Sequence, residues 1–197
     1  MEKAGFWNIA NIISISRIFL LVLAIILLLS NSINLQIASI VLMFIVLNMD
    51  FLDGYVARKY NVVTKFGSVL DVMIDRIVEN AYWITLAYVN VFPLWAPIIV
   101  IIRDFVTDGV RSMMLSQGKT TFQFMKSKLG YAIVASRWSR GLYNISKTVT
   151  FMLGSYQYIY KITSFEPLIL IVVIWTVFFS LLRGIFTVLD AREYLSN

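Results

Sequence analysis

The stretch DFLDGYVARKYNVVTKFGSVLDVMID, which runs from Asp50 to Asp75, decides the organisation of this chain. It places four aspartates within 26 residues, although the whole chain of 197 residues has only 11 acidic side chains. Long apolar runs surround it. A carboxylate at the bilayer centre costs about 2.5–3.5 kcal/mol, so four that faced lipid would cost on the order of 10 kcal/mol. We therefore expect the four, Asp50, Asp53, Asp71 and Asp75, to face protein, water or a cation.

The composition is that of an integral membrane protein. Hydrophobic residues make up 59% of the chain and charged residues 14%, with a mean hydropathy of +0.80, whereas soluble domains have about 25% charged residues. The net charge of +6 comes from Lys and Arg residues dispersed between apolar segments, which favours membrane orientation and anionic ligands over nucleic acid. The absence of cysteine and histidine excludes thiolate chemistry, His-ligated metals and Ser/His nucleophile pairs.

The apolar runs predict an all-α membrane protein, a single domain over residues 1–197 with six transmembrane helices. A short interfacial helix is expected over 2–10, where Phe6 and Trp7 lie beside Glu2 and Lys3. Each longer run is near the ~20 residues that cross a ~30 Å hydrocarbon core. The predicted spans are about 12–30, 34–57, 67–90, 92–115, 129–153 and 166–190.

The loops predict the orientation of these spans. The segments 30–33 and 90–95 contain no Lys or Arg, and 154–165 contains only Lys161. The opposite side holds eight basic residues: Lys3, Arg58, Lys59, Lys65, Lys119, Lys126, Lys128 and Arg192. By the positive-inside rule, both termini and the aspartate stretch face the cytoplasm, which predicts a multi-pass protein of the cell membrane.

The spacing of the aspartates predicts a metal site. At ~100° per residue, Asp50 and Asp53 share one helical face, and Asp71 and Asp75, four residues apart, are neighbours on another helix. An antiparallel helix pair would bring both sets together, where they would repel unless cations lay between them. All-oxygen ligation suits Mg²⁺, Mn²⁺ or Ca²⁺ rather than zinc. The pattern therefore predicts a hard divalent metal.

Small residues and an arginine accompany the aspartates. Gly54, Ala57 and Gly67 are small where a larger side chain would block a ligand or a neighbouring backbone. Arg58 is a natural partner for phosphate. Metals, arginine and close-approach glycines together predict a site for a diphosphate.

Other basic residues occur within the apolar spans, where charge is costly: Arg103, Arg111, Arg137, Arg140, Lys147 and Arg183. Arg140, Asn144 and Lys147 fall on one helical face. Such a face beside a metal site should bind an anion, as an acceptor that carries its own phosphate would require. The residues predicted to bind that phosphate are Arg111, Arg140, Lys147 and Arg183.

The pattern Asp50-x2-Asp53-Gly54-x2-Ala57-Arg58-x8-Gly67-x3-Asp71-x3-Asp75 resembles the signature of the CDP-alcohol phosphotransferase (phosphatidyltransferase) family. Weaker similarity covers most of the chain. The segment Asn11–Arg17 is similar to the opening Pro-Asn-x-Leu-Thr-x-x-Arg of many bacterial members, with Ala10 in the proline position. Residues 101–111 resemble the corresponding segment of phosphatidylglycerophosphate synthases, with Asp104 in place of Glu, whereas residues 136–141 depart from their fifth-helix pattern.

The resemblance implies a six-helix homodimeric enzyme that transfers a phosphatidyl group from CDP-diacylglycerol to an alcohol and releases CMP. The four aspartates would surround two divalent ions, Mg²⁺ or Mn²⁺, and Asp75 would also be the general base for the acceptor hydroxyl. Gly54, Ala57 and Gly67 would line the CDP pocket, with Arg58 on the diphosphate. The similarity of residues 101–111 favours glycerol 3-phosphate as the acceptor, hence phosphatidylglycerophosphate synthesis.

Several alternatives remain open from the residues. The same chemistry with inositol phosphate, another alcohol or an ether-lipid donor would need a similar site. A divalent-cation transporter would also place aspartates in a membrane, although the outer halves of the second and third spans carry no charge. Purely structural roles are a further alternative. The four aspartates could be ion-pair partners of arginines, and Arg76 with Glu79 and Arg103 with Asp104 could be structural ion pairs. Asn11 and Arg17 could serve only to anchor the first helix.

Overall fold

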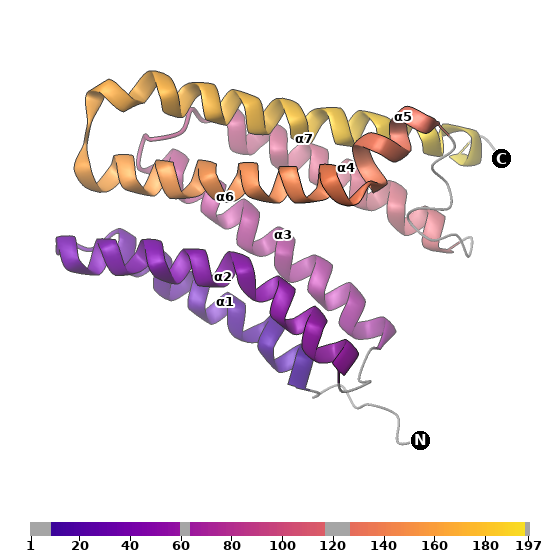
Figure 1. Ribbon diagram of the computed structural model, residues 1–197, viewed down its shortest axis with the longest axis horizontal. Helices are drawn as coiled ribbons and strands as arrows, with labels where there is room; N and C mark the ends of the chain where they lie inside the picture. Colours follow the sequence, from indigo (N-terminus) through magenta and orange to yellow (C-terminus); the bar gives the residue numbers. More distant parts are fainter. Residues whose placement is uncertain (1–8, 60–63, 117–126, 196–197) are drawn as a thin grey trace. The chain divides into compact units, whose positions relative to one another are not determined.

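The computed structural model describes residues 9–59, 64–116 and 127–195, and in these ranges every regular element is a helix (Figure 1). The predicted all-α class is thereby confirmed, whereas the interfacial helix expected over 2–10 falls largely outside the described residues. The long helices are α1 (Ile9–Leu28), α2 (Ile33–Lys59), α3 (Lys65–Tyr88), α4 (Trp95–Ser116), α6 (Arg137–Tyr160) and α7 (Glu166–Leu195). The short elements are α5 (Lys128–Gly130), the π-helix η1 (Tyr131–Ala135) and the 3-10 helix η2 (Thr163–Phe165).

The long helices overlap the six predicted spans, with a difference in the fifth. There the chain forms α5 and η1, is extended at Ser136 (φ −62°, ψ 144°), and only then enters α6. The Ser136 hydroxyl accepts from the Ser139 N–H (3.2 Å), which caps the start of α6. The predicted continuous helix over 129–153 is therefore two helical segments joined at Ser136.

Two described helices are apolar and long enough to cross a bilayer by length and composition. The two apolar segments are Asn11–Leu28 of α1 and Thr163–Arg192, which comprises η2 and most of α7, each with a mean hydropathy of 2.5. The first part of α2, Ile33–Met49, is apolar but shorter. These helices indicate association with a membrane.

The chain divides into two compact units. Unit 1 comprises Met1–Val91 and Gly154–Lys161, and unit 2 comprises Phe92–Leu153 and Ile162–Asn197. The first part of α6 thus belongs to unit 2 and its last residues belong to unit 1.

In unit 1, α1 packs against both α2 and α3. Its buried side chains recur every three or four residues and therefore form one face. That face is polar in its first half and apolar in its second: Asn11, Ser14, Arg17, Leu21, Ala24 and Leu28. The Tyr82 hydroxyl of α3 shares a 2.6 Å hydrogen bond with the Ser155 hydroxyl, which joins the end of α6 to this unit. α3 ends where Asn90 adopts a positive φ of 60°, a conformation that asparagine tolerates better than most residues.

In unit 2, α4 and α7 lie side by side, and α6 is joined to α7 by a hydrogen bond between the hydroxyls of Thr150 and Thr176 (2.8 Å). At the other end, the Ser127 hydroxyl caps α5 by accepting from the Gly130 N–H (2.9 Å) and donates to Asp190 of α7 (3.0 Å). A Cβ atom at Gly130 would overlap the Asp190 carboxylate, so glycine is required for this close approach.

Candidate functional site

The backbone of the first half of the signature lies in the second half of α2. Here Asp50, Asp53, Gly54, Ala57 and Arg58 occupy helical positions, but their side chains lie outside the described residues. The predicted roles of these five residues in binding metal or diphosphate therefore stay predictions.

Gly67 lies in the first turn of α3, at a point of close approach to α1. Thr64 caps the helix: its hydroxyl accepts from the Gly67 N–H at 2.9 Å. A Cβ atom at Gly67 would lie 2.8 Å from Oδ1 of Asn11 and 3.0 Å from the Thr64 hydroxyl oxygen. The glycine thus admits the Asn11 side chain to the start of α3, and its predicted place in the CDP pocket is a separate prediction.

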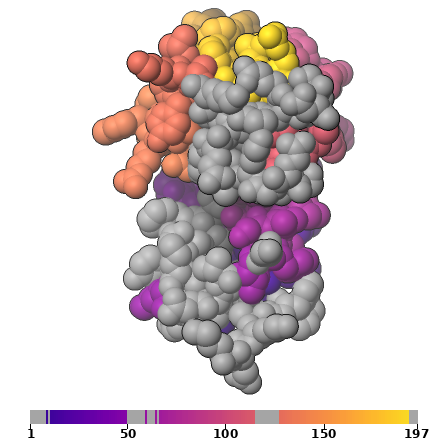
Figure 2. Space-filling view, turned by 90° about the vertical axis from the view of Figure 1, so that its right-hand side faces the viewer, coloured from indigo at the N-terminus to yellow at the C-terminus, as the bar shows by residue number. Residues whose placement is uncertain are grey.

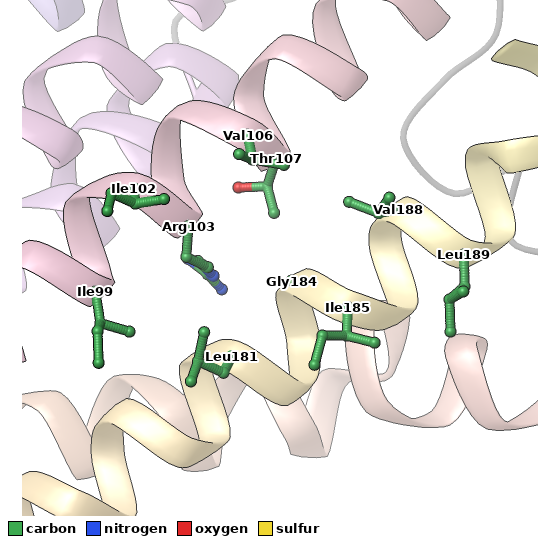
Figure 3. A pocket seen from close by; sticks show the side chains of 10 residues that line it. All are labelled: Ile99, Ile102, Arg103, Val106, Thr107, Leu181, Gly184, Ile185, Val188 and Leu189. Atoms are coloured by element: carbon green, nitrogen blue, oxygen red, sulfur yellow. The ribbon is translucent and has the colours of Figure 1, made fainter.

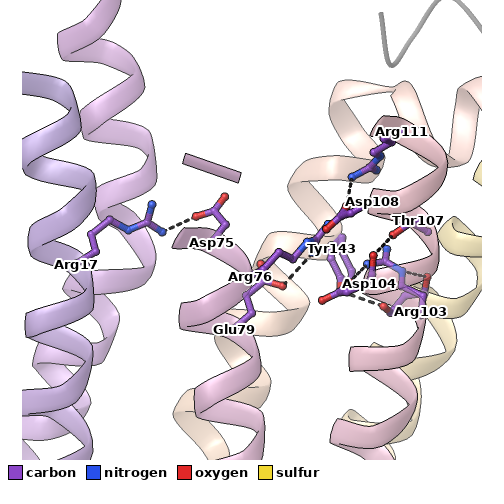
Figure 4. A network of polar contacts seen from close by, with 11 residues as sticks. Arg17, Asp75, Arg76, Glu79, Arg103, Asp104, Thr107, Asp108, Arg111 and Tyr143 are labelled. Carbon is purple, nitrogen blue, oxygen red and sulfur yellow. Dashed lines mark hydrogen bonds and ion pairs between the residues drawn. The ribbon is translucent and has the colours of Figure 1, made fainter. Parts of the chain in front are cut away.

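Asp71 and Asp75 of α3 converge on one guanidinium group from α1, and Figure 4 shows the contact between Arg17 and Asp75. Arg17 donates from Nη2 to Oδ1 of Asp75 at 2.6 Å, and its Nη1 lies 3.7 Å from Oδ1 of Asp71. The Arg17 side chain is 2% exposed, whereas those of Asp71 and Asp75 are 39% and 33% exposed. The arginine therefore lies beneath two carboxylates that remain accessible.

The described acidic residues suit a hard divalent cation in part. Asp71 and Asp75 lie on one side of α3, and their approach to the Arg17 guanidinium shows that the two carboxylates can face a common positive charge. Within the described side chains, the structure gathers no group of three or more acidic residues. Asp50 and Asp53 would have to complete the predicted metal site.

One turn further along α3, Arg76 and Glu79 form an ion pair with 3.7 Å between Nη1 and Oε2. Glu79 is buried and Arg76 is partly exposed. This arrangement supports the structural interpretation of the pair, because Glu79 has a cationic partner on its own helix.

A second polar cluster lies in unit 2, around Tyr143 of α6. The ring centroid of Tyr143 lies 4.8 Å from Lys147 Nζ, 5.3 Å from Arg183 Cζ and 5.6 Å from Arg103 Cζ. All four side chains are buried, with exposures of 6–8%. Cations within ~6 Å of a ring centroid are attracted by its negative face, so the tyrosine helps to hold three like charges in one place.

Arg103 and Asp104, adjacent on α4, both belong to this network. Arg103 donates from Nη1 to Asp104 at 2.6 Å and from Nε to the Ser180 carbonyl at 2.9 Å. The Tyr143 hydroxyl donates to the Ser180 hydroxyl at 3.2 Å. These bonds support a structural role for the pair, since both partners are buried.

Arg183 of α7 is bonded to the junction before α6. It donates to the carbonyls of Ile133 (2.9 Å) and Val134 (3.2 Å) in η1, and to the Ser139 hydroxyl (2.8 Å). The Ser139 hydroxyl also donates to the Ile133 carbonyl. Arg183 thus satisfies backbone groups at the break between η1 and α6. Its predicted contact with an acceptor phosphate would have to use the N–H groups that these bonds leave over, those of Nε and the second one of Nη2.

The other two residues of the predicted acceptor pocket occupy different surroundings. Arg111 lies 3.4 Å from Oδ1 of Asp108, one turn earlier on α4. Arg140 is exposed, as is Trp138 in the first turn of the same helix, α6. Figure 2 shows orange side chains of this part of the chain projecting from one face. Of the four predicted residues, the structure brings Lys147 and Arg183 to the same ring, and only Arg140 among them is fully on the surface.

Unit 2 also contains an apolar cavity of about 510 Å³, lined by residues of α4 and α7 (Figure 3). Ile102 and Val106 of α4 face Ile185 and Leu189 of α7 across it. A Cβ atom at Gly184 would lie 2.8 Å from Cγ of Arg103. The missing side chain of Gly184 therefore gives the Arg103 side chain room to reach the Ser180 carbonyl.

Two features of these clusters were not predicted. The first is the position of Tyr143 among the basic side chains. Because Tyr143 is three residues after Arg140 and four before Lys147, the helical spacing alone could have placed it on the same face. The second is the contact between Arg17 and Asp75, which are 58 positions apart. Its only signal in the sequence was an isolated arginine, Arg17, within an apolar run.

Comparison with known proteins shows that most of the chain matches one protein family. Residues 7–189 match the protein family described as CDP-alcohol phosphatidyltransferase. A CDP-diacylglycerol--glycerol-3-phosphate 3-phosphatidyltransferase of Bacillus subtilis is 34% identical over 94 residues, which are 48% of this chain and 49% of that protein. An enzyme of the same name from Rickettsia typhi is 30% identical over 109 residues, 54% of this chain and 60% of the relative.

A probable cardiolipin synthase (CMP-forming) of Drosophila melanogaster is 37% identical over 76 residues, which cover 36% of this chain and 24% of the relative. The matched residues thus span between 24% and 60% of the length of these three relatives. The family match runs through both compact units.

Proposed function

This chain belongs to the CDP-alcohol phosphatidyltransferase family, and we propose that it transfers a phosphatidyl group from CDP-diacylglycerol to glycerol 3-phosphate. The products would be phosphatidylglycerophosphate and CMP. The observation that carries the proposal is the family match over residues 7–189, supported by relatives with that activity in their names. The neighbouring, partly exposed carboxylates of Asp71 and Asp75 in unit 1 support it, because the reaction would need a base and cation ligands.

In the proposed reaction the acceptor hydroxyl attacks the phosphorus next to the diacylglycerol. The bond from that phosphorus to the bridging oxygen breaks, and the oxygen leaves with CMP. Asp75 accepts the hydroxyl proton, because a hydroxyl is a weak nucleophile at neutral pH and a positioned carboxylate base contributes about 10²–10⁴-fold. The roughly one-third exposure of the Asp75 side chain is consistent with access to a bound acceptor.

The residues that would hold divalent cations are Asp50, Asp53, Asp71 and Asp75. When bound, such cations would neutralise charge on the diphosphate and on the leaving CMP. Gly54, Ala57, Arg58 and Gly67 would bind the CDP group. These assignments follow the family resemblance, and the oxygen-only donor set of the aspartates suits Mg²⁺ or Mn²⁺.

Glycerol 3-phosphate carries a phosphate that a neutral alcohol lacks, and the basic cluster around Tyr143 fits such an anion. Lys147 and Arg183 are buried beside that ring, and Arg183 Nε has no hydrogen-bond partner among the described residues. An anion beside Arg183 would satisfy this buried donor. We assign the acceptor phosphate to this cluster, with Arg111 of α4 and Arg140 of α6 as the further candidates.

The proposed setting is the cytoplasmic side of the cell membrane. Six helices would cross the bilayer, the lipid tails of the donor would stay within it, and the nucleotide would remain in water. A homodimer is the proposed assembly, as implied by the family resemblance.

A second acceptor is favoured by one specific observation. The Drosophila relative is named as a probable cardiolipin synthase (CMP-forming), so phosphatidylglycerol is the alternative acceptor for the same transfer. Its phosphate is a diester with one negative charge, whereas the phosphomonoester of glycerol 3-phosphate carries nearly two at neutral pH. The buried cluster, in which Arg103 is paired with Asp104, keeps a net positive charge from Lys147 and Arg183 and therefore favours the more highly charged acceptor.

The test is CMP release by the purified protein from CDP-diacylglycerol and Mg²⁺, with each acceptor offered alone. We expect release with glycerol 3-phosphate and none with plain glycerol or serine. Release only with phosphatidylglycerol or inositol 1-phosphate would retain the transfer chemistry and replace the acceptor. No release with any acceptor from folded protein would contradict the proposed function.

A further inference from the structure

The polar half of the α1 face ends at Arg17, which is as buried as the apolar Leu21 on the same face. It is 2% exposed, and it follows Asn11 and Ser14 at three-residue intervals on one side of the helix. Leu21, one turn further on, begins the apolar half of the same face. An arginine at such a position would be costly without anionic partners, so its contacts account for its presence.

Those contacts are with the two carboxylates to which the proposed function assigns chemistry. Arg17 Nη2 donates to Asp75 at 2.6 Å, and Nη1 lies 3.7 Å from Asp71. A charge-assisted bond of this length is strong and directional. Both contacts use the Oδ1 atoms, and each carboxylate keeps about a third of its surface exposed (39% and 33%).

We propose that Arg17 is a positioning residue for the transfer reaction: its planar guanidinium holds Asp75 in one orientation from beneath, so that the exposed part of the carboxylate faces the acceptor hydroxyl. This inference rests on the proposed function, which makes Asp75 the base. Arginine suits the task better than lysine, because two of its N–H groups lie in one plane with fixed spacing. Through Asp71, the same group aligns the two carboxylates, which lie one turn apart on α3.

The proposal predicts a specific kinetic effect. Arg17→Ala should lower kcat per folded enzyme by about 10–100-fold, the range seen when a residue that orients a functional ligand is removed. The KM for CDP-diacylglycerol should change little, because Arg17 is buried behind the carboxylates. Arg17→Lys should recover only part of kcat, since an ammonium group cannot reproduce two parallel contacts.

Chemical rescue separates positioning from simple support of the fold. Arg17→Ala leaves space for a free guanidinium ion, and millimolar guanidinium chloride should raise kcat several-fold, whereas potassium chloride at the same ionic strength should not. The matched control is Leu21→Ala, on the same buried face of α1. It should lower thermal stability in detergent and leave kcat per folded enzyme near the wild-type value, with no response to guanidinium.

The outcomes separate the two proposals. A folded wild-type protein that releases no CMP overturns the proposed function, and the inference falls with it. An active wild type together with an Arg17→Ala variant of unchanged kcat overturns only the role of Arg17. So does a variant whose loss of activity equals its loss of folded protein and is not restored by guanidinium. If Arg17→Ala does not fold, the kcat of folded Arg17→Lys tests the inference instead. A kcat equal to that of the wild type overturns the inference, and a reduced kcat supports it.

Discussion

At the scale of single residues, Asp75 carries the sharpest functional assignment, and amide substitution tests it. Asp75→Asn keeps the size of the side chain but cannot accept the acceptor proton as a carboxylate does. We expect transfer to fall by about 10²–10⁴-fold, the usual contribution of a general base, with folded protein recovered in detergent. The measurement is the initial rate of CMP release.

Glu79→Gln is the matched control for this prediction. It makes the same acid-to-amide change one turn further along α3, in the ion pair with Arg76. Its rate should stay within a few-fold of wild type, although its thermal stability should decrease because Glu79 is buried. Transfer at the wild-type rate by Asp75→Asn would contradict the assignment of the base.

Tyr143 is the other informative single residue, because its ring contacts three cations (Lys147, Arg183 and Arg103). Tyr143→Phe keeps the aromatic face and loses only the 3.2 Å hydroxyl bond to Ser180. Tyr143→Leu removes the face, and each cation–π contact is worth about 0.5–2 kcal/mol. We expect KM for glycerol 3-phosphate to rise about tenfold or more in the leucine variant and to change little in the phenylalanine variant.

Steady-state kinetics with the donor at saturation provides the measurement for Tyr143. The KM for CDP-diacylglycerol should be the same in both variants, since the proposed CDP site uses other residues. Equal effects of Phe and Leu, or a change confined to the donor KM, would argue that the ring does not organise the acceptor site.

At the scale of helices, the sequence predicted where most elements lie but not how their polar groups are joined. The predicted spans overlap the six long helices because apolar runs of about 20 residues carry that information directly. The break at Ser136 was missed, since it depends on backbone groups that Arg183 satisfies from another helix. Likewise, the signature identified Asp71 and Asp75 by spacing, whereas their approach to Arg17 required the packing of α1 on α3.

Two glycines of unit 2 test this helix packing. A Cβ atom at Gly184 of α7 would lie 2.8 Å from Cγ of Arg103, whereas one at Gly141 of α6 would meet no atom within 4 Å. Gly184→Ala should therefore displace Arg103 and destabilise the protein by about 1–3 kcal/mol, as overpacking does. Gly141→Ala should be neutral or stabilising by roughly 0.5–1 kcal/mol, because alanine favours a helix.

Thermal unfolding in detergent compares the two glycine variants. The expected order of Tm is Gly141→Ala at or above wild type, then wild type, then Gly184→Ala. A Gly184→Ala protein as stable as wild type would indicate that Arg103 can leave the Ser180 carbonyl at little cost.

At the scale of the whole molecule, the distribution of charge makes a prediction about orientation in the membrane. Eight basic residues occupy the predicted cytoplasmic side and Lys161 alone the other, so the positive-inside rule places the aspartate stretch in the cytoplasm. That side is where a water-soluble acceptor such as glycerol 3-phosphate would reach the site. The chain contains no cysteine, so single cysteines can be introduced into a background that needs no further change.

Cysteine labelling in intact cells then tests the orientation. Ser32→Cys and Ser164→Cys lie in predicted outer loops and should react with a membrane-impermeant maleimide before the cells are opened. Lys59 is exposed at the end of α2, and Lys59→Cys should react only after permeabilisation, because this position lies within the aspartate stretch that is predicted to face the cytoplasm. Labelling of Lys59→Cys in intact cells would show that the orientation is the reverse of the predicted one, with the proposed site away from its soluble substrates. Protection of all three cysteines in intact cells would show that residues 32 and 164 do not lie on the outer surface.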